Sequence, residues 1–330
     1  MKKCCFIIPY FGNFPNYFQQ FLNSCKTNQD YDWLIITDNV ENYNYPKNVK
    51  KIKMSFPQLR DLIQSKFDFQ IALEKPFKLC DYRPAFGYIF TDFLSDYKWW
   101  GHCDIDTLMG DLNDFITDDM LIEYDKLFTL GHFIMYKNNI KKNKLFMTEI
   151  NGEHWYRKVF TTNKAMIFDE VYGGKENINT IFKYTKQKVY ENDVSLNFDP
   201  TKPTKFVKTN YYSKLGKFKN EKQWENKLVV WDNNKILRYR LQNNEVKSTK
   251  YMYLHLQARK MKIQKDLNNK KYAIIPNEFM NITKDDFYQS LKEYKKIRKI
   301  ETKLKFENLI QLDKAIINVR RLKKLLLGKD

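Results

Sequence analysis

Short apolar runs alternate with segments of helical periodicity over the first hundred residues. The strands predicted by these runs are residues 3–9, 33–37 and 50–54. The helices predicted between and after them are residues 16–25 and 58–65. Ser55 followed by Pro57 resembles a capped start of the second helix. This alternation favours a Rossmann-type α/β fold, in which a mixed, mainly parallel sheet has flanking helices and binds ligands at the carboxyl ends of its strands.

The pattern continues with a helix and a strand in the middle of the chain. Residues 81–94 are predicted to form a helix that begins near Pro84, with Asp81 as its cap. The apolar, aromatic run 98–103 predicts a further strand. Two later runs predict strands at residues 228–231 and 251–256.

The C-terminal segment differs from the rest of the chain. Residues 284–327 carry apolar side chains mostly three or four positions apart between lysines and arginines, which predicts an amphipathic helix. The sequence has no internal repeat and no Gly/Ser-rich linker. We therefore expect one domain at residues 1–283 and a basic helical tail at residues 284–330.

Composition and charge restrict the kind of protein this is. With 43% hydrophobic and 16% aromatic residues among 330, the chain can bury a core and is not intrinsically disordered. Its longest apolar runs are too short to cross a bilayer. The five cysteines form no C-x-x-C pair, which argues against a disulfide framework or a structural zinc site. We therefore expect a cytoplasmic protein.

The formal net charge of +19 is concentrated in the last part of the chain. Residues 1–200 contain 25 Lys and Arg against 26 Asp and Glu, whereas residues 201–330 contain 33 against 13. This asymmetry indicates an anionic partner for the C-terminal region. One reading makes the tail an interfacial helix on an anionic membrane surface, peripheral to the inner face of the plasma membrane. In the other reading the tail packs on the domain.

Two aspartates directly after the predicted strand 98–103 are the strongest chemical signal. Asp104 and Asp106 flank Ile105, and in an extended segment residues two apart point the same way. Both carboxylates could then bind one divalent cation while Ile105 enters the core. The alternative for so short a motif is a solvated loop. The preceding strand favours the metal site, because it directs the pair to the ligand edge of an α/β sheet.

Five segments together resemble a bacterial family of GT-A-type glycosyltransferases associated with capsular and lipopolysaccharide-type glycan biosynthesis. They read IIPYFG, DWLIITD, KLCDYRPAFG, WWGHCDIDTLMGD and FDEVYGG, and the resemblance covers about residues 3–260. It implies a GT-A-like catalytic domain with a D-x-D site for Mn²⁺ or Mg²⁺. It also implies transfer of a sugar, here expected to be a hexose from a UDP-sugar, to a saccharide or lipid-linked saccharide.

Further site residues are expected from the same resemblance and from strand geometry. GT-A enzymes often take a third metal ligand from a late strand, and His255 lies in the strand predicted at residues 251–256. In a strand His255 and Gln257 share a face, so Gln257 is expected beside the phosphates, with Lys260 neutralising the diphosphate. The alternative for His255 is an ordinary core histidine.

The remaining donor-site candidates follow predicted strand ends or a helix start. Arg83 could bind phosphate or pair with the D-x-D carboxylates, and Asp81 could contact sugar hydroxyls; an ordinary cap and surface ion pair is the alternative. The residues expected near the nucleoside are Tyr10, Phe11, Thr37 and Asp38. For the two aromatic residues, a place in the core is the alternative.

Asp169 and Glu170 precede two glycines and are the candidate catalytic acids. One of them could accept the proton of the acceptor hydroxyl, although acceptor binding or simple turn chemistry would also explain the pair. The enzymatic rival is a metal-dependent nuclease or phosphodiesterase, which requires further acids around Asp104 and Asp106. A basic nucleic-acid-binding protein is the other rival. It is disfavoured because the first 200 residues are neutral and the sequence contains no recognised nucleic-acid-binding motif, so no nucleic-acid partner is expected.

Overall fold

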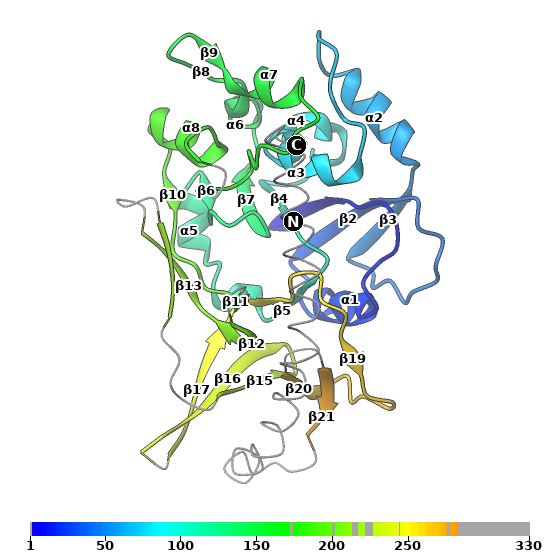
Figure 1. The fold of residues 1–330 in the computed structure, drawn as a ribbon, viewed down its shortest axis with the longest axis vertical. Helices are drawn as coiled ribbons and strands as arrows, with labels where there is room; N and C mark the ends of the chain where they lie inside the picture. The colour runs from blue at the N-terminus through cyan, green and yellow to red at the C-terminus, as the bar shows by residue number, and fades with distance from the viewer. Residues whose placement is uncertain are drawn as a thin grey trace, which may run out of the picture.

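A seven-stranded sheet forms the centre of the N-terminal half of the molecule (Figure 1). The computed structural model describes residues 2–171, 174–199, 202–212, 217–221, 227–243, 245–275 and 278–282. In spatial order the strands of this sheet are β10 (Val189–Tyr190), β6 (Lys126–Leu127), β7 (Phe133–Lys137), β4 (Trp99–Cys103), β1 (Cys4–Pro9), β2 (Tyr31–Thr37) and β3 (Val49–Lys53). Only β7 runs antiparallel to its neighbours, and the other four pairings are parallel. The predicted α/β fold with a mixed, mainly parallel sheet is confirmed.

Both faces of this sheet are buried, as the alternation along β1 shows. Cys5 and Ile7 enter one core cluster, while Cys4, Phe6 and Ile8 enter another. A strand buried on both faces is apolar throughout, which is why residues 3–9 carry a continuous apolar run. The helices that pack around the sheet are α1 (Phe18–Lys26), α2 (Phe56–Gln64), α3 (Leu79–Tyr82), α4 (Phe86–Ile89), α5 (Asp118–Glu123), α6 (Ile140–Asn143), α7 (Trp155–Phe160) and α8 (Ile178–Tyr184).

The start of α2 confirms the predicted cap. The Ser55 hydroxyl accepts a hydrogen bond from the Gln58 backbone N–H, and the Gln58 side chain accepts one from the Ser55 backbone N–H. This capping box satisfies two amide groups that a helix start otherwise leaves unpaired, with Pro57 in the first turn.

The single helix predicted at residues 81–94 is wrong. The segment consists of the short helices α3 and α4, with 3₁₀ turns η2 (Arg83–Ala85) and η3 (Thr91–Phe93). Pro84 has no backbone N–H to donate, so the regular α-helical pattern stops before it and the chain tightens into η2. The first helix begins at Leu79, and Asp81 therefore lies inside it instead of capping it.

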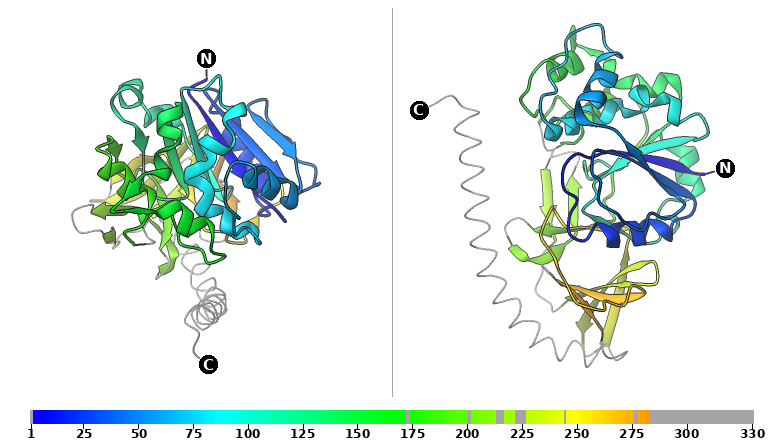
Figure 2. Two further views of the ribbon diagram at one scale, coloured as in Figure 1. Left: turned by 90° about the horizontal axis from the view of Figure 1, so that it is seen from above. Right: turned by 90° about the vertical axis from the view of Figure 1, so that its right-hand side faces the viewer.

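The C-terminal part of the described chain has strands at the two predicted places, residues 228–231 and 251–256, and many more that the sequence did not reveal. A four-stranded sheet has the order β12 (Lys202–Val207), β11 (Leu196–Asp199), β18 (Tyr253–His255) and β5 (Thr107–Met109). A six-stranded sheet has the order β17 (Glu245–Tyr251), β16 (Lys235–Gln242), β15 (Lys227–Asp232), β20 (Lys271–Ile275), β21 (Glu278–Asn281) and β19 (Lys262–Ile263). Figure 2 shows the six-stranded sheet at one end of the molecule, next to the α/β layers.

Smaller elements complete the described fold. The two-stranded sheets are β8 (Glu149–Ile150) with β9 (Glu153–His154), and β13 (Thr209–Tyr212) with β14 (Lys217–Asn220). The other 3₁₀ turns are η1 (Pro76–Lys78), η4 (Leu112–Asp114) and η5 (Leu145–Met147).

Two predictions about the C-terminal segment stay predictions. The helix expected at residues 284–327 lies outside the described residues. The predicted division into a domain at residues 1–283 and a tail at residues 284–330 is untested for the same reason. Where the structure describes the chain, no helix combines the length and the hydrophobicity that crossing a bilayer demands.

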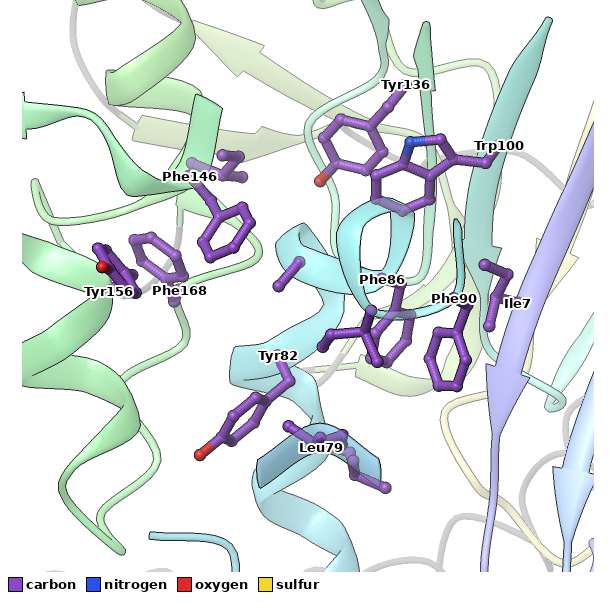
Figure 3. Close-up of a cluster of buried hydrophobic side chains, with 14 of the residues drawn as sticks. Ile7, Leu79, Tyr82, Phe86, Phe90, Trp100, Tyr136, Phe146, Tyr156 and Phe168 are labelled. Atoms are coloured by element: carbon purple, nitrogen blue, oxygen red, sulfur yellow. The ribbon is translucent and has the colours of Figure 1, made fainter. Parts of the chain in front are cut away.

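Tight packing joins α4 to the central sheet (Figure 3). The Trp100 ring stacks on Tyr136, with centroids 4.4 Å apart, and its Nε1 donates to Asn143 Oδ1 over 2.8 Å. Gly87 lies against the same indole, so close that a Cβ added there would be 2.2 Å from Trp100 Nε1. The position therefore has no room for any side chain.

Replacing Gly87→Ala should lower the free energy of unfolding by about 3 kcal/mol, since the methyl group displaces the Trp100 ring. Urea unfolding followed by tryptophan fluorescence measures this. The control is Gly152→Asn, in an open turn with φ of +84°, which should cost less than about 1 kcal/mol. Equal stabilities of the two variants would contradict the packing argument.

Candidate active site

The chain passes from the seven-stranded sheet to the four-stranded sheet through the D-x-D segment. Asp104 follows β4, Ile105 and Asp106 form a turn, and β5 begins at Thr107. The prediction of an extended segment is therefore wrong, because the chain must turn to change sheets. Its consequence holds nonetheless: Ile105 is buried in the core, and Asp104 and Asp106 lie together.

His255 reaches the same place from β18. That strand pairs with β5 so that His255 lies opposite Thr107. The Nε2 atom of His255 is 3.4 Å from Asp106 Oδ1 and 3.7 Å from Asp104 Oδ2. One ligand atom from each of the three side chains lies within 4.8 Å of the other two.

This donor set fits a hard or borderline divalent cation. Bonds of about 2.1 Å in octahedral geometry put neighbouring ligand atoms about 3 Å apart. His255 Nε2 lies 3.4 and 3.7 Å from the nearest oxygens of the two aspartates. Two carboxylates and one imidazole suit Mn²⁺, and the carboxylates alone also suit Mg²⁺. The residues present could therefore hold the metal that the resemblance implies.

The charges within the cluster also favour a cation. Burial opposes the protonated form of His255, but the neighbouring Asp106 and Asp104 outweigh burial and raise the pKa of the imidazole. Burial raises the pKa of Asp104, against the opposing effect of Arg83. For Asp106, burial is overcome by His255 and by the Ala258 backbone N–H, which lower the pKa. The site is thus a negative pocket that a positive charge stabilises.

Arg83 connects the D-x-D motif to the second pair of acids. Its Nη1 atom donates to Asp169 Oδ2 over 2.9 Å and to the Gly131 carbonyl over 3.0 Å, and its Nη2 atom donates to Asp104 Oδ1. Of the two roles predicted for Arg83, pairing with a D-x-D carboxylate is thus present in the structure.

Asp169 and Glu170 lie beside Gly131. The Gly131 N–H donates to Glu170 Oε2 over 2.8 Å, and a Cβ added to Gly131 would be 2.8 Å from Asp169 Oδ2. Only glycine allows this approach. Burial raises the pKa of Asp169 to about 7 even though Arg83 opposes the shift, and burial likewise raises the pKa of Glu170. Asp169 can therefore exchange a proton near neutral pH.

A cavity of about 500 Å³ collects most of these groups at the carboxyl ends of β1 and β4. Its polar wall holds Arg83, Asp104, Asp106, Asp169 and Glu170, and its apolar wall includes Tyr10, Phe11, Pro76, Phe77 and Ile167. Phe77 is 77% exposed and lies at the rim of this wall. The cavity thus combines a negative cluster, one guanidinium and aromatic surfaces.

Asp81 does not reach the cavity. It is fully buried, accepts a 2.7 Å hydrogen bond from Lys78 Nζ, and accepts the backbone N–H groups of Met166 and Phe168 over 2.8 Å each. The prediction that Asp81 contacts sugar hydroxyls is not supported by this position. Instead, Asp81 holds the segment that leads into Asp169.

The structure does not place Thr37, Asp38, Gln257 or Lys260 on the cavity wall. Thr37 Oγ1 accepts the Asn39 backbone N–H over 3.1 Å, and Asp38 Oδ1 accepts the Gly12 N–H over 3.1 Å. The predicted common face of His255 and Gln257 is wrong, because β18 ends at His255 and Gln257 has φ of +51°. Gln257 and Lys260 are exposed.

His132 is a neighbour of the site that the sequence analysis missed. Its ring stacks on His255 with centroids 4.3 Å apart, and its Nδ1 atom lies 2.8 Å from Tyr253 Oη. Burial lowers the pKa of His132 well below the usual range, so the ring is neutral. The pairing of β7 with β4 brings it here, and no local sequence signal reports that pairing.

The raised pKa of Asp169 predicts a pH-dependent stability. The folded carboxyl has a pKa of about 7, and an unfolded one of about 3.9, so the folded state binds more protons between those values. The free energy of unfolding therefore falls as the pH rises through this window. Asp169→Asn cannot titrate, so its stability relative to wild type should be greater at about pH 8 than at about pH 5.

Urea unfolding of the metal-free protein at both pH values measures this difference. Asp61→Asn, an exposed surface change, is the control and should show no such pH dependence. A stability difference for Asp169→Asn that is the same at both pH values would contradict the assignment.

Asp81→Ala should destabilise the protein by about 3–5 kcal/mol, because it leaves Lys78 buried without its carboxylate partner. Hydrogen exchange should also accelerate at the Met166 and Phe168 amides, which lose their acceptor. The double change Lys78→Met with Asp81→Leu should recover part of the stability, since it removes both buried charges. A loss below about 1 kcal/mol for Asp81→Ala would refute the anchoring role.

Comparison with known proteins identifies a family without an assigned function. No curated protein matches the chain significantly. Among solved structures, the galactosyltransferase LgtC in complex with donor and acceptor sugar analogues aligns with a TM-score of 0.33 and 10% identity, covering 60% of this chain and 76% of that one. An active-site mutant of LgtC gives a TM-score of 0.32 at the same identity and coverage. A family of unknown function, DUF6625, matches residues 6–283, and the chain therefore belongs to the DUF6625 family.

Proposed function

We propose that this protein is a metal-dependent glycosyltransferase. It would move a hexose from a nucleotide sugar, most simply a UDP-sugar, to a hydroxyl of a saccharide or lipid-linked saccharide in capsular or lipopolysaccharide-type glycan assembly. The observation that carries the proposal is the group of Asp104, Asp106 and His255, whose two aspartates line a cavity at the carboxyl ends of strands in a mainly parallel sheet.

The donor side of the cavity would be organised by the negative cluster. Asp104, Asp106 and His255 would hold Mn²⁺ or Mg²⁺. When bound, such a cation supplies positive charge where the leaving diphosphate gains negative charge. Arg83 keeps Asp104 in place through its guanidinium, and Tyr10 and Phe11 offer ring surfaces on the apolar wall of the same cavity for the nucleoside.

The acceptor side would use Asp169 and Glu170. Both carboxylates line the cavity, and the Arg83 guanidinium lies between Asp169 and Asp104 and pairs with both. With a pKa near 7, Asp169 can accept the proton of an attacking hydroxyl at neutral pH, as an inverting transfer requires. Glu170, fixed by the Gly131 N–H, is suited to bind an acceptor hydroxyl or to serve as the base itself.

The geometry favours this function over a two-metal nuclease or phosphodiesterase. A two-metal site needs further acids converging on the first ion. In the ranges that the structure describes, the group that could hold a metal ion contains two aspartates and one histidine. The next acids, Asp169 and Glu170, are held by Arg83 and Gly131 instead.

The cellular context stays a prediction. We expect a cytoplasmic enzyme, with the basic tail of residues 284–330 either bound to the inner face of the plasma membrane or packed on the domain. Association with a membrane would bring the cavity to a lipid-linked acceptor.

Mn²⁺ together with UDP should raise the melting temperature by several degrees, and UDP without metal should have little effect, because bound ligands stabilise the folded state by mass action. Asp104→Asn and Asp106→Asn should abolish this metal-dependent shift. Both variants should also slow Mn²⁺-dependent release of UDP from UDP-hexoses at least about 100-fold, as expected when the group that stabilises the leaving charge is lost.

Differential scanning fluorimetry and a coupled UDP assay provide the two readouts. Asp61→Asn is the matched control, since it makes the same chemical change at an exposed position away from the cavity. If no nucleotide changes the melting temperature of wild type in the presence of Mn²⁺ or Mg²⁺, the proposed function is refuted.

A further inference from the structure

A buried chain of hydrogen bonds leads away from the cavity behind His255. The Nδ1 atom of His255 lies 3.2 Å from Asn197 Oδ1. The Nδ2 atom of Asn197 donates to Ser195 Oγ over 2.9 Å, and the Ser195 hydroxyl donates to Asp193 Oδ1 over 2.6 Å. All four side chains are buried, with exposures from 0 to 8%. Within the described chain, this series of hydrogen bonds contacts the His255 ring at Nδ1, the side opposite the carboxylates that face Nε2.

The sheet register fixes the first link of the chain. Strands β11 and β18 are parallel, and Asn197 pairs with His255 while Leu196 pairs with Leu254. Side chains of paired residues on adjacent strands project from the same face of the sheet. The contact between Asn197 and His255 therefore follows from strand pairing and does not depend on a flexible loop.

The chemistry of each group fixes the direction of the hydrogen bonds. An ionised Asp193 only accepts, so the Ser195 hydroxyl donates to it. The hydroxyl must therefore accept from its other neighbours, Asn197 and Tyr253. The Asn197 amide nitrogen is one of these donors, which turns the amide oxygen toward His255. An amide oxygen only accepts, and Nδ1 of His255 therefore carries a proton.

This direction matters at the opposite nitrogen of the ring. In a neutral imidazole with a proton on Nδ1, the lone pair is on Nε2, which faces Asp104 and Asp106. Without Asn197, the favoured neutral form would carry its proton on Nε2, because two carboxylates accept it there. That proton would occupy the position of a metal bond.

We propose that Asn197, oriented by Ser195 and Asp193, is a positioning residue that presents the Nε2 lone pair of His255 to a divalent cation and so sets the metal affinity. The proposal rests on the proposed metal site. Such indirect hydrogen bonds orient ligating histidines in metalloproteins, and their loss typically weakens metal binding by about 10–100-fold. The His132 ring stacked on His255 restricts the same imidazole from its face.

The test compares Mn²⁺ binding by wild type, Asn197→Leu and Asn197→Asp. Titration at one pH, followed by the electron paramagnetic resonance signal of free Mn²⁺, gives the dissociation constants. Pulsed measurements of the bound ion report coupling to a directly ligated nitrogen, which a purely structural role of Asn197 would not change. Asn179→Leu is the matched control, because Asn179 is also buried but bonds Lys126 in another part of the molecule.

Asn197→Leu should weaken Mn²⁺ binding by about 10–100-fold and remove the nitrogen coupling. Asn197→Asp keeps an acceptor for Nδ1–H, so it should retain both the affinity and the coupling. Ser195→Ala frees the Asn197 amide to rotate and should weaken binding less than Asn197→Leu. Asn179→Leu should leave the affinity and the coupling unchanged.

Three other results would overturn the proposal, and each shows a different part of it to be wrong. If wild type shows a nitrogen coupling that His255→Ala removes, but Asn197→Leu binds Mn²⁺ like wild type, the positioning role fails while the metal site stands. If Asn179→Leu weakens binding as much as Asn197→Leu, general destabilisation explains the loss. If wild type binds no Mn²⁺, the metal site and the positioning role fail together.

Discussion

The site depends on a buried guanidinium that holds two separate acidic segments together. Arg83 contacts Asp104 at the end of β4 and Asp169 in the segment before α8. Burying several carboxylates in one place is unfavourable unless positive charge or hydrogen-bond donors compensate. Here Arg83, His255 and the N–H groups of Gly131 and Ala258 provide that compensation. The remaining negative charge is what makes the cavity suited to a cation.

The rest of the fold serves to keep these charges at fixed distances. Asp104 and Asp106 lie where the chain leaves the seven-stranded sheet and enters the four-stranded sheet, so both sheets restrain them. The buried Lys78 and Asp81 pair ties the segment before Asp169 to α3, directly before Arg83. The acids of the site are therefore held from several elements, and a displacement of one element would change the charge balance of all.

A cavity with these charges is suited to stabilising the negative charge of a leaving group. It is less suited to attack by a nucleophile of the protein. Its strongest features are the negative cluster for a cation and a carboxyl group, Asp169, with a pKa near 7. In the proposed function, an inverting glycosyl transfer would use both, one on each side of the sugar. The aromatic wall with Tyr10 and Phe11 adds the apolar surface that a nucleoside needs.

The sequence alone determined the local elements and the chemical type of the site. Apolar runs and the Ser55 cap predicted strands and a helix that the structure contains, because these features depend on neighbours within one turn or strand. Asp104, Asp106 and His255 were expected together, and they are together. The interrupted helix was not predicted: Pro84 was expected near the start of one helix, whereas the chain is already helical from Leu79 and Pro84 interrupts it.

Only the tertiary structure decided which polar residues reach the cavity and which support it. Asp81 and Arg83 are two positions apart, yet one is buried against Lys78 and the other lines the cavity. Two residues support His255: Asn197 in β11 and His132 directly before β7. The pairing of these strands has no signal in the order of residues. Contacts between strands distant in sequence depend on register, and register is set by the packing of the whole core.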